Sequence, residues 1–183
     1  MKLKLNVLFF ITFFSAITLS CDTSSTTRVK NTAEYNSSLD TWNTLKETHG
    51  TSYTYSIRFS SFSRNGSTTT ITVNNNAVIS RIYEAYSMYD STGNYLGYEN
   101  RLILDSYTEN EASIGSNNNG ALPLTIDALY TACLSKYLIV DTDKNTVVFN
   151  VDDSSIIKDC YYIPNGCQDD CSFGINISDF SWL

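Results

Sequence analysis

Histidine is almost absent from this chain of 183 residues, in which His49 is the only one. A Ser-His-Asp catalytic group would have to use His49. No Gly-x-Ser-x-Gly nucleophile elbow and no glycine loop that could cradle a phosphate accompany it. His49 precedes Gly50 at an expected helix end, where a cation complements the helix dipole. The sequence therefore gives nucleophilic catalysis no support.

Basic residues are also scarce, with 12 Lys and Arg against 19 Asp and Glu and a formal net charge of −7. Phosphate backbones bind proteins through Lys and Arg, so an acidic chain is repelled by them. We therefore expect no nucleic-acid partner. Electrostatic adsorption to an anionic bilayer is disfavoured for the same reason.

A membrane-spanning run is missing as well. The longest apolar tract runs from Leu5 to Ile17, after Lys2 and Lys4. It is shorter than the roughly 20 residues that a spanning helix needs. A positive start, a short apolar stretch and small residues before a cut site are typical of a secretory signal. We therefore expect residues 1–20 to be a signal peptide.

Cys21 stands at the expected cut site, and this position resembles that of the lipidated cysteine of bacterial lipoproteins. Acyl chains on Cys21 would attach the protein to a bacterial membrane, on the periplasmic or the cell-surface side of the envelope. Each buried methylene would contribute about 0.8 kcal/mol. Such signals favour Leu three residues before the cysteine, whereas Leu19 lies two before it. An ordinary signal peptide, with Cys21 free or removed, is the alternative.

The other cysteines support an exported protein. The chain has five cysteines, and lipid on Cys21 would leave four, which can form two disulfides outside the cytoplasm. Three connectivities are possible. A zinc site is the alternative, but structural zinc prefers ligands two to four residues apart, often with histidine. Disulfides are therefore the favoured interpretation. The four candidates are Cys133, Cys160, Cys167 and Cys171.

The mature chain divides into a tether and one domain. Residues 21–36 are mostly polar after the cysteine, and we expect a lipidated N-terminus followed by a flexible tether. Residues 37–183 have the size of one domain and can bury a sizeable core. No internal repeat or second linker divides them.

The domain is expected to be α+β, mainly an antiparallel sheet with two helices packed on one face and stabilised by disulfides. Alternating residues, turn formers and capping residues predict the elements. Asn65-Gly66 and Asn74 to Asn76 are the expected hairpin turns. The first helix is expected to begin at a Ser or Asp cap within residues 37–40 and to end at Gly50, and the second is expected over 126–134. The strands are expected over 53–59, 68–73, 77–86, 101–107, 145–151, 156–163 and 173–182.

Acidic residues provide the weak candidates for metal binding or catalysis. Asp141 and Asp143 begin a run like a calcium loop, but Thr146 replaces the required glycine and Asp152 the bidentate Glu. A polar turn is the favoured interpretation. The pairs Asp152-Asp153 and Asp169-Asp170 could act as acid and base or hold a cation, but such pairs more often cap turns. We therefore expect no metal and no cofactor.

Aromatic residues provide the weak candidates for ligand binding. The chain has 13 Tyr, 9 Phe and 2 Trp. Most should belong to the sheet, but exposed Tyr among Asn, Ser and Gly is also typical of recognition surfaces and of glycan-binding faces. The candidates lie in one segment: Tyr83, Tyr86, Tyr89, Tyr95 and Tyr98.

Several short motifs follow one another along the chain. They are Trp42, then Tyr53-x-Tyr55, then Ile71-Thr72-Val73-Asn74-Asn75, then Thr125-Ile126-Asp127-Ala128-Leu129-Tyr130, then Asp169-Asp170 before Ile175-x-Ile177-x-x-Phe180. This order resembles an uncharacterised family of small secreted bacterial proteins and lipoproteins. The likeness would cover about residues 40–181, and it implies the fold and the address but no activity. The chain departs from the family pattern because it lacks cysteines just after the Tyr-x-Tyr strand and has them near the C-terminus.

These observations favour a cell-envelope lipoprotein that is not an enzyme and that binds a protein, a peptide or a glycan. One alternative is an envelope hydrolase or metal-dependent enzyme that uses the Asp pairs. Another is an inhibitor of a secreted enzyme, which would use a rigid aromatic surface.

Overall fold

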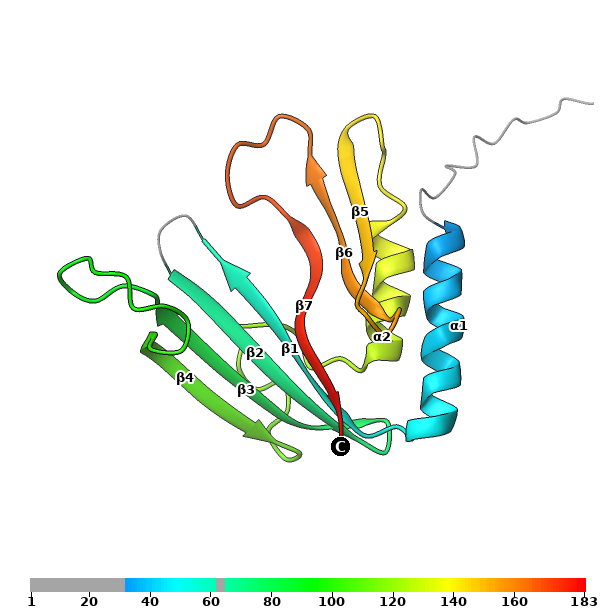
Figure 1. The fold of residues 1–183 in the computed structure, drawn as a ribbon, viewed down its shortest axis with the longest axis horizontal. Coiled ribbons are helices and arrows are strands. Elements are labelled where there is room, and N and C mark those ends of the chain that lie inside the picture. The colour runs from blue at the N-terminus through cyan, green and yellow to red at the C-terminus, as the bar shows by residue number, and fades with distance from the viewer. Residues whose placement is uncertain (1–31, 62–64) are drawn as a thin grey trace, which may run out of the picture.

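The computed structural model describes residues 32–61 and 65–183. The expected signal peptide and Cys21 lie outside the described residues. The elements are α1 (Thr32–His49), β1 (Tyr53–Ser60), β2 (Asn65–Asn74), β3 (Ala77–Ser87), β4 (Leu102–Asn110), α2 (Ile126–Ala132), η1 (Cys133–Tyr137), β5 (Asn145–Val151), β6 (Ile157–Pro164) and β7 (Phe173–Trp182). The strands form one antiparallel sheet in the order β4-β3-β2-β1-β7-β6-β5 (Figure 1). The α+β class, with mainly antiparallel sheet, is confirmed.

Both helices pack on the same face of the sheet, which we call the inner face. Trp42 of α1 is fully buried, and its ring meets Tyr53 of β1 edge-on at 5.2 Å. The Tyr53 hydroxyl accepts a hydrogen bond of 2.9 Å from the amide of Ile126, the first residue of α2. Burial of the Tyr53 phenol raises its pKa to about 12, although the bond from Ile126 opposes the shift. One tyrosine thus joins the sheet to both helices.

Helix α1 begins inside the expected tether. Tyr35 is buried, and its ring lies 5.7 Å from that of Tyr130 and 5.8 Å from that of Phe149. The hydroxyl of Tyr130 also hydrogen-bonds Ser38 of α1. The domain therefore begins before residue 37, and the expected tether of residues 21–36 is shortened at its end.

One of the two expected hairpin turns is confirmed, and the other is wrong. Asn75 and Asn76 have φ values of 48° and 63°, as in the two-residue turns that join twisted strands. Asn65 and Gly66, by contrast, lie within β2, where Gly66 pairs with Ser60. A Cβ on Gly66 would lie 2.8 Å from the ring of Tyr86. Glycine therefore permits a close contact at this position and does not form the turn.

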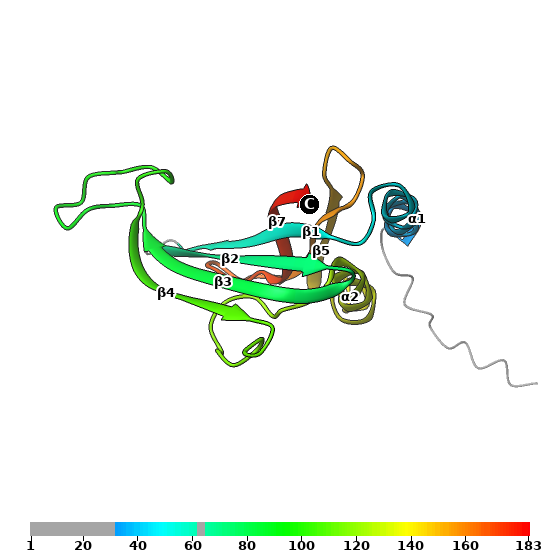
Figure 2. The ribbon, with the colours of Figure 1, turned by 90° about the horizontal axis from the view of Figure 1, so that it is seen from below.

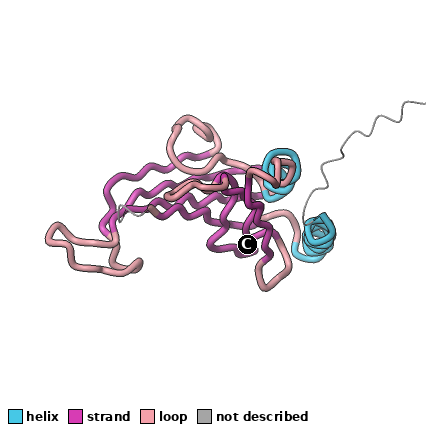
Figure 3. Tube along the Cα trace, turned by 90° about the horizontal axis from the view of Figure 1, so that it is seen from above, coloured by secondary structure: helices cyan, strands magenta, loops and turns pink. Residues whose placement is uncertain are grey.

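A loop segment, residues 111–125, covers the part of the inner face that the helices leave open (Figures 2 and 3). Beneath it lie Arg81 of β3 and Glu109 of β4, whose side chains are each 1% exposed and 3.2 Å apart. Arg81 also donates to the carbonyls of Asn117 and Ala121, at 3.1 and 2.8 Å. Main-chain oxygens thus share the charge of Arg81, as a buried cation requires.

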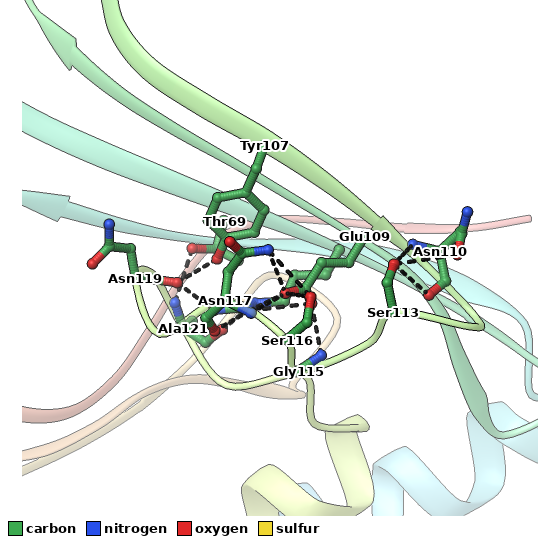
Figure 4. A network of polar contacts seen from close by, with 11 residues as sticks. Thr69, Tyr107, Glu109, Asn110, Ser113, Gly115, Ser116, Asn117, Asn119 and Ala121 are labelled. Carbon is green, nitrogen blue, oxygen red and sulfur yellow. Dashed lines mark hydrogen bonds and ion pairs between the residues drawn. The ribbon is translucent and has the colours of Figure 1, made fainter.

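The carboxylate of Glu109 is enclosed in the same way (Figure 4). It accepts bonds of 2.7 Å from the amides of Gly115 and Asn117, and further bonds from the Asn117 side chain and Arg81. Burial alone would raise the pKa of Glu109, but these donors outweigh it and lower the pKa to about 2. The ionised carboxylate therefore holds the loop segment to the sheet.

The second helix begins where the sequence predicts it. Thr125 caps α2 by accepting a 3.2 Å bond from the Ala128 amide. After Ala132 the helix widens into η1, a π-helical turn in which the Leu138 amide donates a hydrogen bond to the Cys133 carbonyl.

The four cysteines form two disulfide bonds. The bonded pairs are Cys133–Cys160, with Cα atoms 5.7 Å apart, and Cys167–Cys171, with Cα atoms 6.3 Å apart. The expectation of two disulfides is confirmed, and the cysteines pair in one of the three possible connectivities. Because all four sulfurs are bonded, none of them is a thiolate that could bind zinc.

Candidate functional site: the cleft between β1 and β7

Strands β1 and β7 diverge after a short pairing. Their register runs from Tyr53 opposite Trp182 to Ile57 opposite Ile177, with an irregularity after Ser56. Beyond that point β1 continues to Ser60 beside β2, while the first part of β7 pairs with β6. Figure 1 shows the two strands separating. The sheet is therefore split along one strand boundary.

A cleft of about 560 Å³ lies at this split. We call it the β1–β7 cleft. Its walls combine isoleucine and aromatic side chains with carboxylate, amide and hydroxyl groups, the mixture that is typical of ligand sites. The lining residues are Ile57 to Ser60 of β1, Tyr161 and Ile163 of β6, Asp169 to Ser172 of the following loop, and Gly174, Ile175, Asn176 and Ser178 of β7.

The main chain of β1 contributes to this cleft. Hydrogen-bonded residues alternate along an antiparallel pair. The Ser61 amide donates to the Asn65 carbonyl at 3.0 Å, so the odd-numbered residues of β1 face β2 in the ladder. The N–H and C=O groups of Arg58 and Ser60 therefore point the other way, toward the cleft. The edge of β1 past the last pair with β7 is thus one wall of the site.

An acidic loop closes one end of the cleft. The Cys167–Cys171 disulfide ties off the loop that carries Asp169 and Asp170. Both aspartates are exposed and line the cleft. A carboxylate oxygen of Asp170 accepts a 2.6 Å bond from the Ser61 hydroxyl, so the loop reaches across to the end of β1. The disulfide therefore limits how far the two carboxylates can move.

Arg58 adds one positive charge to the cleft. Its guanidinium lies 3.9 Å from the ring centre of Tyr98, and one of its nitrogens is 3.5 Å from a carboxylate oxygen of Asp179. Arg101 lies 4.3 Å from the same ring and forms an ion pair with Glu84. The Tyr98 ring thus fixes the side chain of Arg58 beside the cleft by cation–π contact.

The five candidate tyrosines do not form one surface. Tyr83 stacks on Tyr107, beside the loop segment that crosses the inner face. Tyr86 is buried on the opposite face, where its ring meets Tyr98 edge-on. Tyr89 and Tyr95 pair with each other in the loop after β3. The ring of Tyr98 contacts Arg58, which lines the cleft.

The structure does not bring Asp141, Asp143 and Asp152 together. Asp141 and Asp143 lie in the turn before β5, where Asp141 accepts from the Asp143 amide and pairs with Lys144. Asp152 follows β5 at its other end and accepts from the amides of Ser154 and Ile156. Within residues 32–61 and 65–183, no three Asp, Glu, His or Cys side chains gather as metal ligands would.

The only histidine, His49, packs against a tryptophan of the sheet. It ends α1, and its ring stacks on Trp182 at 5.1 Å.

In the described part of the chain, no helix has both the length and the apolar character needed to cross a bilayer.

Comparisons with known proteins give no further guide to the site. No family model, no curated protein and no solved structure matches the chain. The resemblance to a family of small secreted bacterial proteins therefore stays a prediction from its motifs.

Proposed function

We propose that the protein is a non-enzymatic binding domain of the bacterial cell envelope that takes its ligand in the β1–β7 cleft. The supporting observation is the split of the sheet, which places strand edges and mixed polar and apolar side chains around one space of about 560 Å³. A continuous sheet would close this space by pairing. The binding partner would be a protein, a peptide or a glycan of the envelope.

The proposed address is an acylated Cys21 at a membrane, with the domain on the outer or periplasmic side. The two disulfides support it, because such bonds persist outside the reducing cytoplasm. Intact-mass measurement of the processed protein tests this part. An N-terminal Cys21 with an added acyl mass is the expected result, and an unmodified product would remove the anchor from the proposal.

The binding role is tested with a variant that fills the cleft. Ser60→Trp adds a large ring to the lining of the cleft at the end of β1, whereas Ser80→Trp adds the same ring to β3, outside the lining. Both proteins would be incubated with solubilised envelope proteins, peptidoglycan fragments and glycans. The proposal expects a ligand that wild type and Ser80→Trp bind and Ser60→Trp does not. Equal binding by all three proteins would place the ligand site elsewhere.

A further inference from the structure

We infer that the β1–β7 cleft takes an extended cationic peptide segment of a partner protein. The segment pairs with the exposed edge of β1 and sets a Lys or Arg side chain against Asp169 and Asp170. This inference rests on the proposed function of the cleft and adds the class of ligand and the groups that recognise it.

The exposed edge of β1 favours a polypeptide ligand. By the alternation of the β1–β2 ladder, Arg58 and Ser60 direct their main-chain groups into the cleft, past the last pair with β7. An extended peptide satisfies such an edge with its own N–H and C=O groups, as in β-strand addition. The main chain of a sugar polymer contains no N–H and C=O groups that alternate along one edge. Polypeptide is therefore the ligand that complements the β1 wall.

The polar and apolar groups of the walls indicate the residue types of the segment. Ile57, Ile163 and Ile175 supply apolar surface, while Asp169 and Asp170 form the acidic end. A segment that contains both apolar and basic residues can therefore place an apolar side chain against the isoleucines and a basic one against the carboxylates at that end.

The charge of the cleft favours a basic side chain in the ligand. Among the described residues that line the cleft, Arg58 is the only cation, and it is held by Tyr98 and Asp179. The side chain of Asp170 accepts one bond, from Ser61, which leaves a carboxylate with further acceptor capacity. The Cys167–Cys171 bond keeps both carboxylates at the cleft, which reduces the ordering that binding requires. A cationic side chain complements this end.

The experiment measures fluorescence anisotropy of labelled Val-Lys-Val-Lys-Val titrated with the purified mature protein. The same peptide with Glu for Lys, and one N-methylated at alternate amides, test the charge and the edge pairing. Chitohexaose, a neutral sugar, serves as the glycan probe in a competition assay and by calorimetry. The double variant Asp169→Asn, Asp170→Asn is compared with Asp143→Asn, Asp153→Asn, which removes two exposed carboxylates outside the cleft lining.

The inference expects the Lys peptide to bind and both modified peptides to bind at least tenfold more weakly. The Asp169 and Asp170 variant should weaken binding by roughly tenfold, since exposed ion pairs each contribute a factor of about 2 to 5. The matched variant should bind within about twofold of wild type. Retained tryptophan fluorescence in each variant confirms that it is folded.

Four results would overturn the inference, and they separate it from the proposed function. If chitohexaose binds and the Lys peptide does not, the cleft remains a ligand site, but its ligand is a glycan. Equal binding of the Lys and Glu peptides removes the acidic pair from recognition. Binding of the Lys peptide that is equally weak in both double variants makes the attraction a general charge effect, and failure of every probe to bind removes the cleft itself.

Discussion

The disulfide between Cys133 and Cys160 should contribute much more stability than the one between Cys167 and Cys171. The first joins residues 27 apart, and the second joins residues 4 apart. If a disulfide acts by restricting the unfolded chain, the two separations correspond to about 3.5 and about 1.9 kcal/mol. Both cysteines of the first pair are fully buried, whereas the second pair closes a surface loop.

The perturbation is a pair of double variants, Cys133→Ala with Cys160→Ala and Cys167→Ala with Cys171→Ala. Urea unfolding is followed by tryptophan fluorescence, since Trp42 stacks on Trp182 in the core at 5.3 Å. With an m-value of about 2 kcal/mol/M, the midpoint should fall by about 1.8 M in the first variant and by about 0.9 M in the second.

Equal midpoint shifts in the two variants would refute this reasoning. They would mean that chain entropy does not set the contribution of either bond. A larger shift for the Cys167 and Cys171 variant would mean that the acidic loop supports the whole domain and not the cleft alone. Reducing the wild type should reproduce the sum of both shifts, which provides an internal control.

Three further predictions concern buried positions. Trp42→Ala should lower the free energy of unfolding by about 3–5 kcal/mol, measured by urea titration with circular dichroism, because it removes a fully buried ring; a loss below about 1 kcal/mol would contradict the packing. The pKa of Glu109 is lowered from 4.5 to about 2 in the folded protein. The ionised carboxylate therefore stabilises the fold above pH 4.5, and this stabilisation is lost as the pH falls toward 2. The difference in melting temperature between wild type and Glu109→Gln should therefore become smaller as the pH falls through that range. A difference that stays constant would contradict stabilisation by the ionised carboxylate of Glu109. Gly66→Ala should lower the free energy of unfolding by about 1–3 kcal/mol, measured by thermal unfolding, because its Cβ would lie 2.8 Å from both the Tyr86 ring and the Phe59 carbonyl oxygen. An unchanged melting temperature would contradict this close contact.

Local signals predicted much of the fold. The alternation around Tyr53 and Tyr55 gave a strand with one buried face, and Thr125 gave the start of α2. The three asparagines from Asn74 gave a true turn. In each case the deciding contacts lie within a few residues, so the sequence pattern contains them.

Long-range contacts explain what the sequence did not predict. Gly66 looks like a turn residue, but Tyr86, on the next strand, decides its role. The buried pair of Arg81 and Glu109 depends on strand register and on a loop that folds back over both. The sequence does not predict the cleft for the same reason, since the cleft arises where the pairing of β1 with β7 stops at Ile177. The sequence shows Asp169-Asp170 as an acidic pair, but it does not place the pair beside β1.

Backbone amide chemical shifts, measured by NMR, would show directly whether a cationic peptide binds in the β1–β7 cleft. The isotope-labelled mature protein would be titrated with Val-Lys-Val-Lys-Val. We expect saturable shift changes at Arg58, Ser60 and the loop from Asp169 to Ser172, where the peptide would meet β1 and the carboxylates. Shift changes confined to the loop that carries Tyr89 and Tyr95, or no saturable change at all, would exclude binding in the cleft.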